Sequence, residues 1–266
     1  MTSYETLTVE TDDRGVARVT LNRPQRHNAL NDTMIAELRR AADALGNDDR
    51  VRVVVLTGSG SDKSFCAGGD ITWFARNLER SRAEQIHESG ELARMLLDLY
   101  SLPKALIGRI NGSAYGGGVG MISVCDVAVG ARGARFGLTE VRLGLVPANI
   151  SPYVVKRIGV ANSRATMLSG ALFDADRAAA IGLLHEVAEP EELDTRVEAV
   201  VAEHLQAEPG AVADTKKLID FVSRNAIADS MVYTADRLAD GWESEAGRTG
   251  VRCFLDKKLP PWRSRT

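Results

Sequence analysis

The chain has 266 residues, of which 44% are hydrophobic and 26% charged, and its formal net charge is −3. This length suits one large domain or two small ones, and the acidic balance argues against nucleic acid as the main partner, since nucleic-acid-binding domains usually carry a basic excess. No apolar run in the sequence approaches the roughly 20 residues of a membrane span, and three widely spaced cysteines indicate neither a disulfide framework nor a zinc site, so we expect a reduced, cytoplasmic protein without a metal.

The N-terminal third alternates predicted strands with a predicted helix. Residues 4–10 and 16–22 alternate apolar and polar side chains around a turn-like DDRG, which is typical of a β-hairpin. Asn31 or Asp32 then caps a predicted helix. Residues 51–58 form a short β-branched run, which predicts a buried strand.

The middle of the chain continues this alternation. Ser81 and Glu84 match a capping box and predict the start of a second long helix. Residues 104–110 and 124–130 are further short apolar runs and predict two more buried strands on either side of a glycine-rich segment.

The C-terminal part has a different pattern. From about residue 190 the periodicity is helical almost to the end, with predicted breaks near residues 208–210 and near Gly241. We find no internal repeat, low-complexity tract or linker. The order of elements therefore predicts an α/β core followed by a helical C-terminal region.

Two glycine-rich turns each follow a predicted buried strand. They are FCAGGDI at residues 65–71 and YGGGVG at residues 115–120, and their spacing departs from both the P-loop and the dinucleotide-binding fingerprints. Glycine lets a backbone approach a ligand closely, and a helix that begins there adds free N–H donors. Two such turns facing one another could hold one oxygen between two N–H groups as an oxyanion hole. On spacing alone, tight strand-to-helix packing explains the glycines equally well.

Four ordered segments of the chain resemble those of one enzyme family. LNRPQRHNAL, SFCAGGDI, NGSAYGGGVG and TEVRLGLVP are similar to segments of the crotonase superfamily of enoyl-CoA hydratases and isomerases. The resemblance covers about residues 5–260. It implies a spiral of ββα units in residues 1–195 and a helical trimerisation region in residues 196–266, with assembly as a homotrimer or a hexamer of two trimers.

The resemblance also implies the chemistry of the site. The substrate is an acyl-CoA thioester, and the N–H groups of Gly69 and Gly117 match the two oxyanion donors that stabilise its enolate. Coenzyme A enters only as part of the substrate, so the resemblance implies no separate cofactor.

The proton carrier is where this chain departs from the family pattern. In hydratases of the family two glutamates share a water molecule, and their positions match Glu140 and Gly120, so only one carboxyl group remains. Glu140 is the predicted acid/base. Its alternative role is that of a surface glutamate favoured by a helix start.

Losing the second glutamate permits two activities. A single carboxylate is enough to move a proton between two carbons, as in the Δ3,Δ2-enoyl-CoA isomerases of the family. Hydratases resembling methylglutaconyl-CoA hydratases also lack the second glutamate, and residues 140–159 resemble these members most. We therefore predict a hydratase, with a branched or dicarboxylic enoyl-CoA for which Gly120 leaves room. An isomerase and a non-catalytic acyl-CoA-binding protein are the alternatives.

Further residues match the family's binding positions for coenzyme A, where backbone groups would meet the adenine and pantetheine. These positions are Arg26, His27, Ala67, Asp70 and Ile71, together with Phe254 and Lys257 in a C-terminal region that reaches the site of a neighbouring subunit. A solvated terminal helix explains Phe254 and Lys257 equally well. Trp73 and Phe74 follow the first glycine turn and are candidates for lining the acyl pocket, with packing as the equal alternative.

Overall fold

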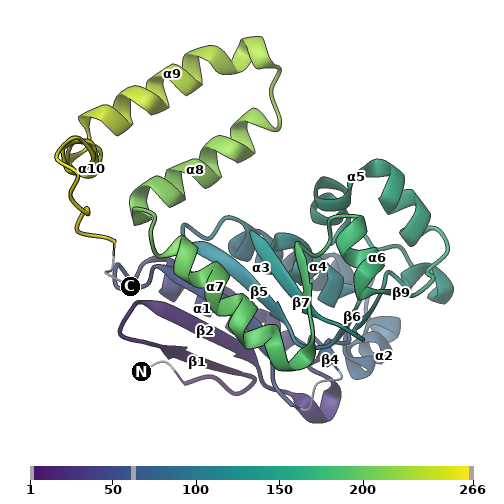
Figure 1. Ribbon diagram of the computed structural model, residues 1–266. Coiled ribbons are helices and arrows are strands. Elements are labelled where there is room, and N and C mark those ends of the chain that lie inside the picture. Colours follow the sequence, from purple (N-terminus) through teal and green to yellow (C-terminus); the bar gives the residue numbers. More distant parts are fainter. Residues whose placement is uncertain (1–2, 61–63, 264–266) are drawn as a thin grey trace.

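The computed structural model, which describes residues 3–60 and 64–263, folds around two β-sheets (Figure 1). The larger sheet has the strand order β1 (Leu7–Thr11), β2 (Val16–Leu21), β3 (Val53–Gly58), β5 (Ala105–Ile110), β7 (Val127–Ala131) and β10 (Glu186–Ala188). The smaller sheet has the order β4 (Ser64–Cys66), β6 (Ser113–Tyr115), β8 (Arg135–Gly137) and β9 (Phe173–Asp174). The β1–β2 hairpin predicted from the alternating pattern is present and antiparallel.

The chain passes repeatedly from the larger sheet to the smaller one and then into helices. β3 leads through β4 to α2 (Ile71–Glu79) and α3 (Arg82–Tyr100), and β5 leads through β6 to α4 (Gly117–Val124). β7 leads through β8 to the 3-10 helix η2 (Glu140–Leu143) and to α5 (Ser151–Met167). This succession confirms the predicted spiral of ββα units. Because β4 and β6 are parallel neighbours, the two glycine turns that follow them lie at the same edge of the smaller sheet.

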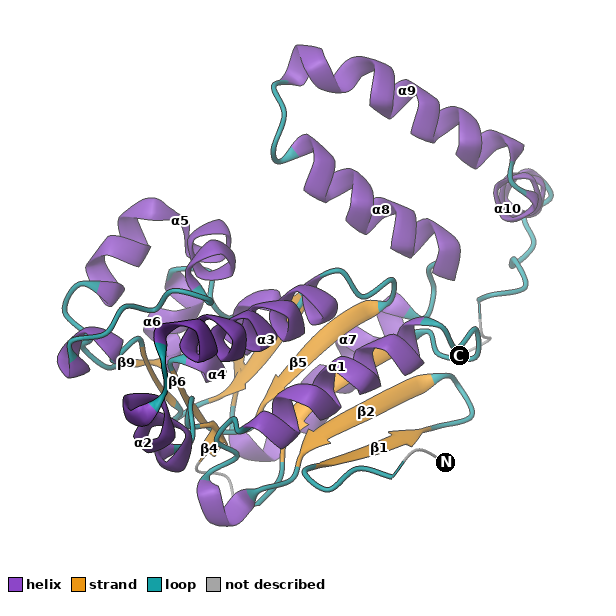
Figure 2. Cartoon of the chain, turned by 180° about the vertical axis from the view of Figure 1, so that it is seen from behind, coloured by secondary structure: helices purple, strands orange, loops and turns teal. Residues whose placement is uncertain are grey.

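The central strand β3 of the larger sheet is buried on both faces. Along β3, Val54 and Leu56 belong to a core shared with α1 (Asp32–Gly46), α3 and α4, whereas Val53 and Val55 belong to a second core shared with α7 (Leu193–His204). Figure 2 shows α1 and α3 across one face of this sheet. Burial on both faces explains why the strand reads as a continuous apolar run in the sequence.

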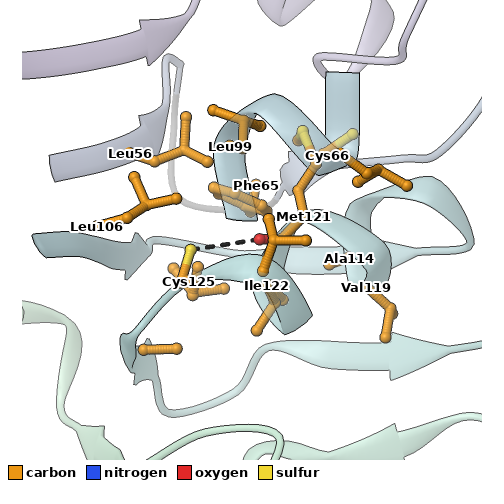
Figure 3. Packing of buried hydrophobic residues seen from close by; sticks show 14 of the residues in the cluster. Leu56, Phe65, Cys66, Leu99, Leu106, Ala114, Val119, Met121, Ile122 and Cys125 are labelled. Carbon is orange, nitrogen blue, oxygen red and sulfur yellow. Dashed lines mark hydrogen bonds between the residues drawn. The ribbon is translucent and has the colours of Figure 1, made fainter. Parts of the chain in front are cut away.

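Figure 3 shows the centre of the first core, where Leu56 and Leu106 of the sheet lie near Leu99 of α3 and the buried helix α4. The Sγ of Cys125 donates a hydrogen bond to the carbonyl oxygen of Met121 at 3.3 Å. Burial raises the pKa of this thiol to about 12. Cys125 is therefore a small packing residue of the core and not a reactive nucleophile.

Both predicted helix caps are correct. Asn31 caps α1 by accepting a hydrogen bond from the backbone N–H of Met34, and Ser81 with Glu84 forms a complete capping box at α3. The strand predicted at residues 124–130 begins later, at Val127, because the buried helix α4 continues to Val124. The remaining short elements are η1 (Pro24–Arg26), α6 (Ala175–Ala180) and η3 (Pro190–Glu192).

Three C-terminal helices form an arm that stands away from the two sheets in both views (Figures 1 and 2). They are α8 (Pro209–Val222), α9 (Ile227–Glu243) and α10 (Glu245–Leu255). Both predicted breaks are present: α8 begins at Pro209, and near Gly241 the helix α9 ends at Glu243, where Ser244 caps α10. The division predicted at residue 195 lies inside α7, which packs on the sheet, so the segment that leaves the core begins at α8. No helix in the described residues is long and apolar enough to cross a bilayer.

Candidate active site

The two glycine turns contact one another. Gly68 and Gly116 have φ angles of +87° and +48°, in the region that residues with a side chain rarely adopt. A Cβ atom on Gly68 would lie 2.7 Å from the carbonyl oxygen of Tyr115, which is closer than such atoms can approach. Glycine at these positions therefore allows both the backbone conformation and the close approach of the first turn to the second.

The first turn is fixed against the segment before α1. Gly69 forms a parallel bridge with Leu30, and the hydrogen bonds of this bridge are made by its neighbours and not by Gly69 itself. In such a bridge the N–H of the central residue points away from its partner strand. The three backbone hydrogen bonds that hold the turn run from Leu30 to Gly68 at 2.7 Å, from Asp70 to Leu30 at 2.9 Å and from Ala67 to His27 at 3.0 Å.

The second turn leads directly into a helix. Gly117 is the first residue of α4, and the N–H groups of a first helical turn have no partner within the helix. In the described part of the chain, neither Gly69 N–H nor Gly117 N–H is engaged in a hydrogen bond. Both glycines line the same cavity. The structure thus brings the two predicted oxyanion donors together at one site, with the partial positive charge of the α4 N-terminus behind them.

A cavity of about 520 Å³ lies between the turns, α2, α3 and the segment that precedes α5. Its walls are mainly apolar side chains, and Glu140 is the single charged residue among those that line it in the described chain. The larger apolar side chains of the lining are Leu30, Ile35, Ile71, Trp73, Phe74, Leu92, Leu143, Leu145, Val146, Pro147 and Ile150. A concave apolar site with few polar groups is the usual form of a small-molecule binding site.

Glu140 enters this cavity from the first position of η2. A Cβ atom on Gly116 would lie 3.0 Å from its Oε1, so the carboxyl group lies directly beside the second glycine turn. Its Oε2 is buried and has no hydrogen-bond partner among the described residues. Burial raises the pKa of Glu140, and a hydrogen bond from its own backbone N–H opposes this only in part. A carboxyl group with a raised pKa in an apolar cavity is suited to proton transfer.

Gly120 lies behind the cavity wall and is itself fully buried in α4. A Cβ atom at this position would lie 2.3 Å from Cγ2 and 2.9 Å from Cβ of Ile150. Ile150 is 3% exposed and forms part of the cavity lining. The expectation that Gly120 leaves room for a substrate branch is therefore wrong, because Ile150 fills that space. No local pattern in the sequence connects these two residues.

Asp70 has a role inside the fold. Its carboxylate accepts a hydrogen bond from the N–H of Thr72 at the start of α2 and pairs with the guanidinium of Arg23 at 2.8 Å. Burial acts to raise the pKa of Asp70, but the hydrogen bonds from Thr72 and Arg23 outweigh it and lower the pKa to about 2. This side chain therefore holds the first turn in place.

The other predicted binding residues fall into two groups. Ala67 and Ile71 line the cavity, and Ile71 is 85% exposed at its rim. Arg26 and His27 are exposed on the segment that is bonded to the first turn, and His27 Nδ1 lies 3.2 Å from Oγ of Ser64.

Phe254 and Lys257 are not brought to this cavity within one chain. Phe254 is 81% exposed on α10, and Lys257 follows the same helix. Both views place α10 at the opposite end of the molecule from α2 (Figures 1 and 2).

Trp73 and Phe74 both line the cavity, and they also pack on one another with ring centroids 5.5 Å apart. Sequence reasoning did not identify Ser89 and Asn149, which line the same cavity and are joined by a hydrogen bond of 2.8 Å from Asn149 Nδ2 to Ser89 Oγ. The described residues contain no group of three or more His, Cys, Asp or Glu side chains that could hold a metal ion.

Comparisons with known proteins agree with this geometry. Residues 11–265 match the family model for enoyl-CoA hydratase/isomerase. A relative from Thermus thermophilus is 34% identical over 254 residues, which cover 95% of this chain and 99% of the relative. Crotonyl-CoA hydratase of Syntrophomonas wolfei is 31% identical over 257 residues, with 96% and 97% of the two chains covered. The crystal structure of an enoyl-CoA hydratase from Shewanella pealeana superimposes with a TM-score of 0.92 at 30% identity, covering 97% of this chain and 96% of that one.

Proposed function

The chain belongs to the enoyl-CoA hydratase/isomerase family, and we propose that it adds water across the 2,3 double bond of an enoyl-CoA thioester. The observation that carries this proposal is the meeting of Gly69, Gly117 and Glu140 in one apolar cavity. Relatives named crotonyl-CoA hydratase and short-chain-enoyl-CoA hydratase, each at least 30% identical over more than 90% of the chain, support hydration as the reaction.

The geometry supports the following sequence of steps. The thioester carbonyl oxygen binds between the N–H groups of Gly69 and Gly117. When water attacks C3, negative charge develops on this oxygen as the enolate forms, and each aligned donor of this kind typically contributes about 3–4 kcal/mol to the transition state. The ionised carboxyl group of Glu140 takes a proton from the attacking water and then delivers it to C2. The hydroxyl group on C3 and the proton on C2 together account for one water molecule.

The lining of the cavity supports a neutral acyl chain. A second carboxylate on the substrate would lie in the same cavity as Glu140, where no cationic side chain is among the described lining residues. Burying an unpaired charge costs several kcal/mol or more. A dicarboxylic substrate of the methylglutaconyl-CoA type is therefore less well supported than an unsubstituted or neutral branched one, and Gly120 does not provide the room for a branch.

The arm supports assembly into a homotrimer or a hexamer of two trimers. Its helices expose large apolar side chains that the fold of one chain leaves uncovered, which marks a protein–protein contact surface. These side chains are Ile219, Ile227, Met231, Val232, Leu238, Trp242, Phe254 and Leu255. In such an assembly Phe254 and Lys257 would serve the coenzyme A site of a neighbouring copy, and Arg26 would meet phosphate within its own chain. Mass measurement in solution, with Ile227→Lys as the disrupting variant, tests the assembly.

Isomerisation is the second candidate, and one observation favours it. Ile150 stands where a second carboxyl group would lie, so Glu140 alone moves protons. A single carboxyl group is enough to take a proton from C4 and return it to C2. A non-catalytic acyl-CoA-binding protein is the third candidate, and the buried carboxyl group beside the glycine turns argues against it.

Product analysis by mass separates these candidates. Purified protein is incubated with crotonyl-CoA, a trans-3-enoyl-CoA and 3-methylglutaconyl-CoA. A product of crotonyl-CoA heavier by one water, absent with Glu140→Gln and present with the exposed control Glu79→Gln, would support the hydratase. A trans-3-enoyl-CoA converted at unchanged mass would support the isomerase. No turnover of any thioester would refute both activities.

A further inference from the structure

A single carboxyl group leaves part of the hydration reaction without a residue. Glu140 can accept one proton of the attacking water, but a water molecule held by one hydrogen bond is poorly oriented for attack on C3. The side chain that would supply a second contact from position 120 is absent, and Ile150 there is apolar. A second polar group in the cavity would orient this water.

Among the neutral polar side chains that line the cavity in the described chain, Ser89 of α3 and Asn149 of the segment before α5 are hydrogen-bonded to one another, and the others are Tyr115 and Thr139. Ser89 and Asn149 are sixty positions apart in sequence, and Asn149 Nδ2 donates to Ser89 Oγ at 2.8 Å. Asn149 is also the direct neighbour of Ile150. The same turn of the backbone therefore places an apolar side chain against Gly120 and a polar one across the cavity towards α3.

The pair keeps unused hydrogen-bonding groups. Asn149 donates to Ser89 through Nδ2, so the Oδ1 of Asn149 remains an acceptor. Within the described chain this oxygen accepts no hydrogen bond. Ser89 accepts through Oγ, and its O–H likewise has no recorded acceptor among the described residues. Both side chains are only half-buried, since they face the cavity. Polar groups left free in an otherwise apolar wall are those that fix the orientation of a bound group.

We propose that Asn149 and Ser89 bind the water molecule that adds to the enoyl group, in the role that a second carboxyl group would otherwise have. The inference rests on the proposed hydratase function. Oδ1 of Asn149 accepts a hydrogen bond from one O–H of the water, which is kept in the hydroxyl group of the product, and Glu140 takes the proton of the other O–H. The lone pair of the water then forms the bond to C3, and the proton on Glu140 passes to C2. Ser89 holds the Asn149 amide in the orientation that presents Oδ1.

Two reactions of the same site separate this role from a merely structural one. Hydration of crotonyl-CoA needs the bound water, the oxyanion donors and Glu140. Exchange of the C2 protons of butyryl-CoA with D2O needs the oxyanion donors and Glu140 but adds no water. A variant that only loosens the segment around Asn149 would slow both reactions, whereas loss of the water contact slows hydration alone.

The variants are Asn149→Leu and Ser89→Ala, and the matched control is Asn162→Leu. Asn162 lies on α5, where its Nδ2 donates a hydrogen bond to the carbonyl oxygen of Ile158 at 2.9 Å, and it does not line the cavity. Loss of one hydrogen bond in the transition state predicts a fall of about 10–100-fold in kcat for hydration with Asn149→Leu. Ser89→Ala is expected to show a smaller fall, and C2 exchange should stay within about twofold of wild type for both.

The outcomes are distinct. Slower hydration with unchanged exchange supports the proposal. Hydration by Asn149→Leu at the wild-type rate, or an equal loss of hydration and exchange, overturns it. A wild-type protein that exchanges the C2 protons of butyryl-CoA but hydrates no thioester overturns the proposed function as well as this inference.

Discussion

The contact between Gly120 and Ile150 makes a sharp prediction about stability. Replacing Gly120 by alanine adds one methyl group, which would lie 2.3 Å from Cγ2 and 2.9 Å from Cβ of Ile150. Because Ile150 is 3% exposed and is held by its branched Cβ close to the backbone, it can move aside only with a shift of its own segment. Gly120→Ala should therefore destabilise the protein, although alanine is the better helix former.

Two opposing terms set the size of this effect. Glycine to alanine inside a helix gains up to about 1 kcal/mol, whereas one extra methyl group in a packed core costs about 1–3 kcal/mol. We expect a net loss of about 1–2 kcal/mol in the free energy of unfolding. Ile150→Ala alone should cost about 2–5 kcal/mol. In the double variant the methyl group enters the space that Ile150 left, so the two losses should not add.

The assay is urea unfolding of the wild type, Gly120→Ala, Ile150→Ala and the double variant at one protein concentration. Gly90→Ala in α3 is the matched control, because a Cβ there would meet only the end of the flexible Arg94 side chain, at 3.5 Å. This control should be stabilised by up to about 1 kcal/mol. A Gly120→Ala protein as stable as the control, or a double variant with strictly additive losses, would refute the packing argument. The same contact means that Gly120→Glu must be combined with Ile150→Ala before it can test a second carboxyl group.

Three further predictions concern titratable groups. Burial raises the pKa of Glu140, and its ionised form is the one that accepts a proton. On lowering the pH, kcat/KM for hydration should therefore begin to fall before the pH reaches the ordinary glutamate pKa of about 4.3. A pH–rate profile with no acid limb above that value would contradict this. Asp70→Asn breaks the buried pair with Arg23 and should cost about 3–5 kcal/mol by urea unfolding, with a loss below about 1 kcal/mol as the contrary result. Its folded pKa of about 2 means that this stability is present above the ordinary value of about 3.9 and is lost as the pH falls towards 2. Burial and the nearby Arg157 lower the pKa of His185 in the folded protein. The stability that depends on the neutral imidazole is therefore complete above about pH 6.5 and is lost as the pH falls through the lower pKa of the folded state. In His185→Gln the slope of the free energy of unfolding against pH should flatten in this range.

The residues that could be predicted from the sequence are those whose role depends on local backbone geometry. The turns around Gly68 and Gly116 need φ angles that favour glycine, and the two N–H donors follow from the position of each turn between a strand and a helix. The buried strand at β3 and the capping box at Ser81 likewise depend on neighbours within a few positions. Such features leave a periodicity or a motif that can be read without knowing the fold.

Features that depend on the meeting of distant elements could not be predicted in this way. The side chain missing at Gly120 suggested open space, but whether a space is open depends on what packs into it, and Ile150 comes from another element thirty positions later. The partner of the Asp70 carboxylate is likewise distant in sequence, since Arg23 lies 47 positions earlier.

The sequence by itself therefore determined the family, the ββα spiral, the glycine turns and the choice of Glu140 as the candidate acid/base. Only the tertiary structure decided the shape and charge of the cavity: the apolar wall at Ile150, the lack of a cationic side chain among the described lining residues, and the pair of Ser89 with Asn149. The physical reason is that backbone conformation is set by nearby residues, whereas a cavity is the space left between side chains from segments that have no regular spacing in the sequence.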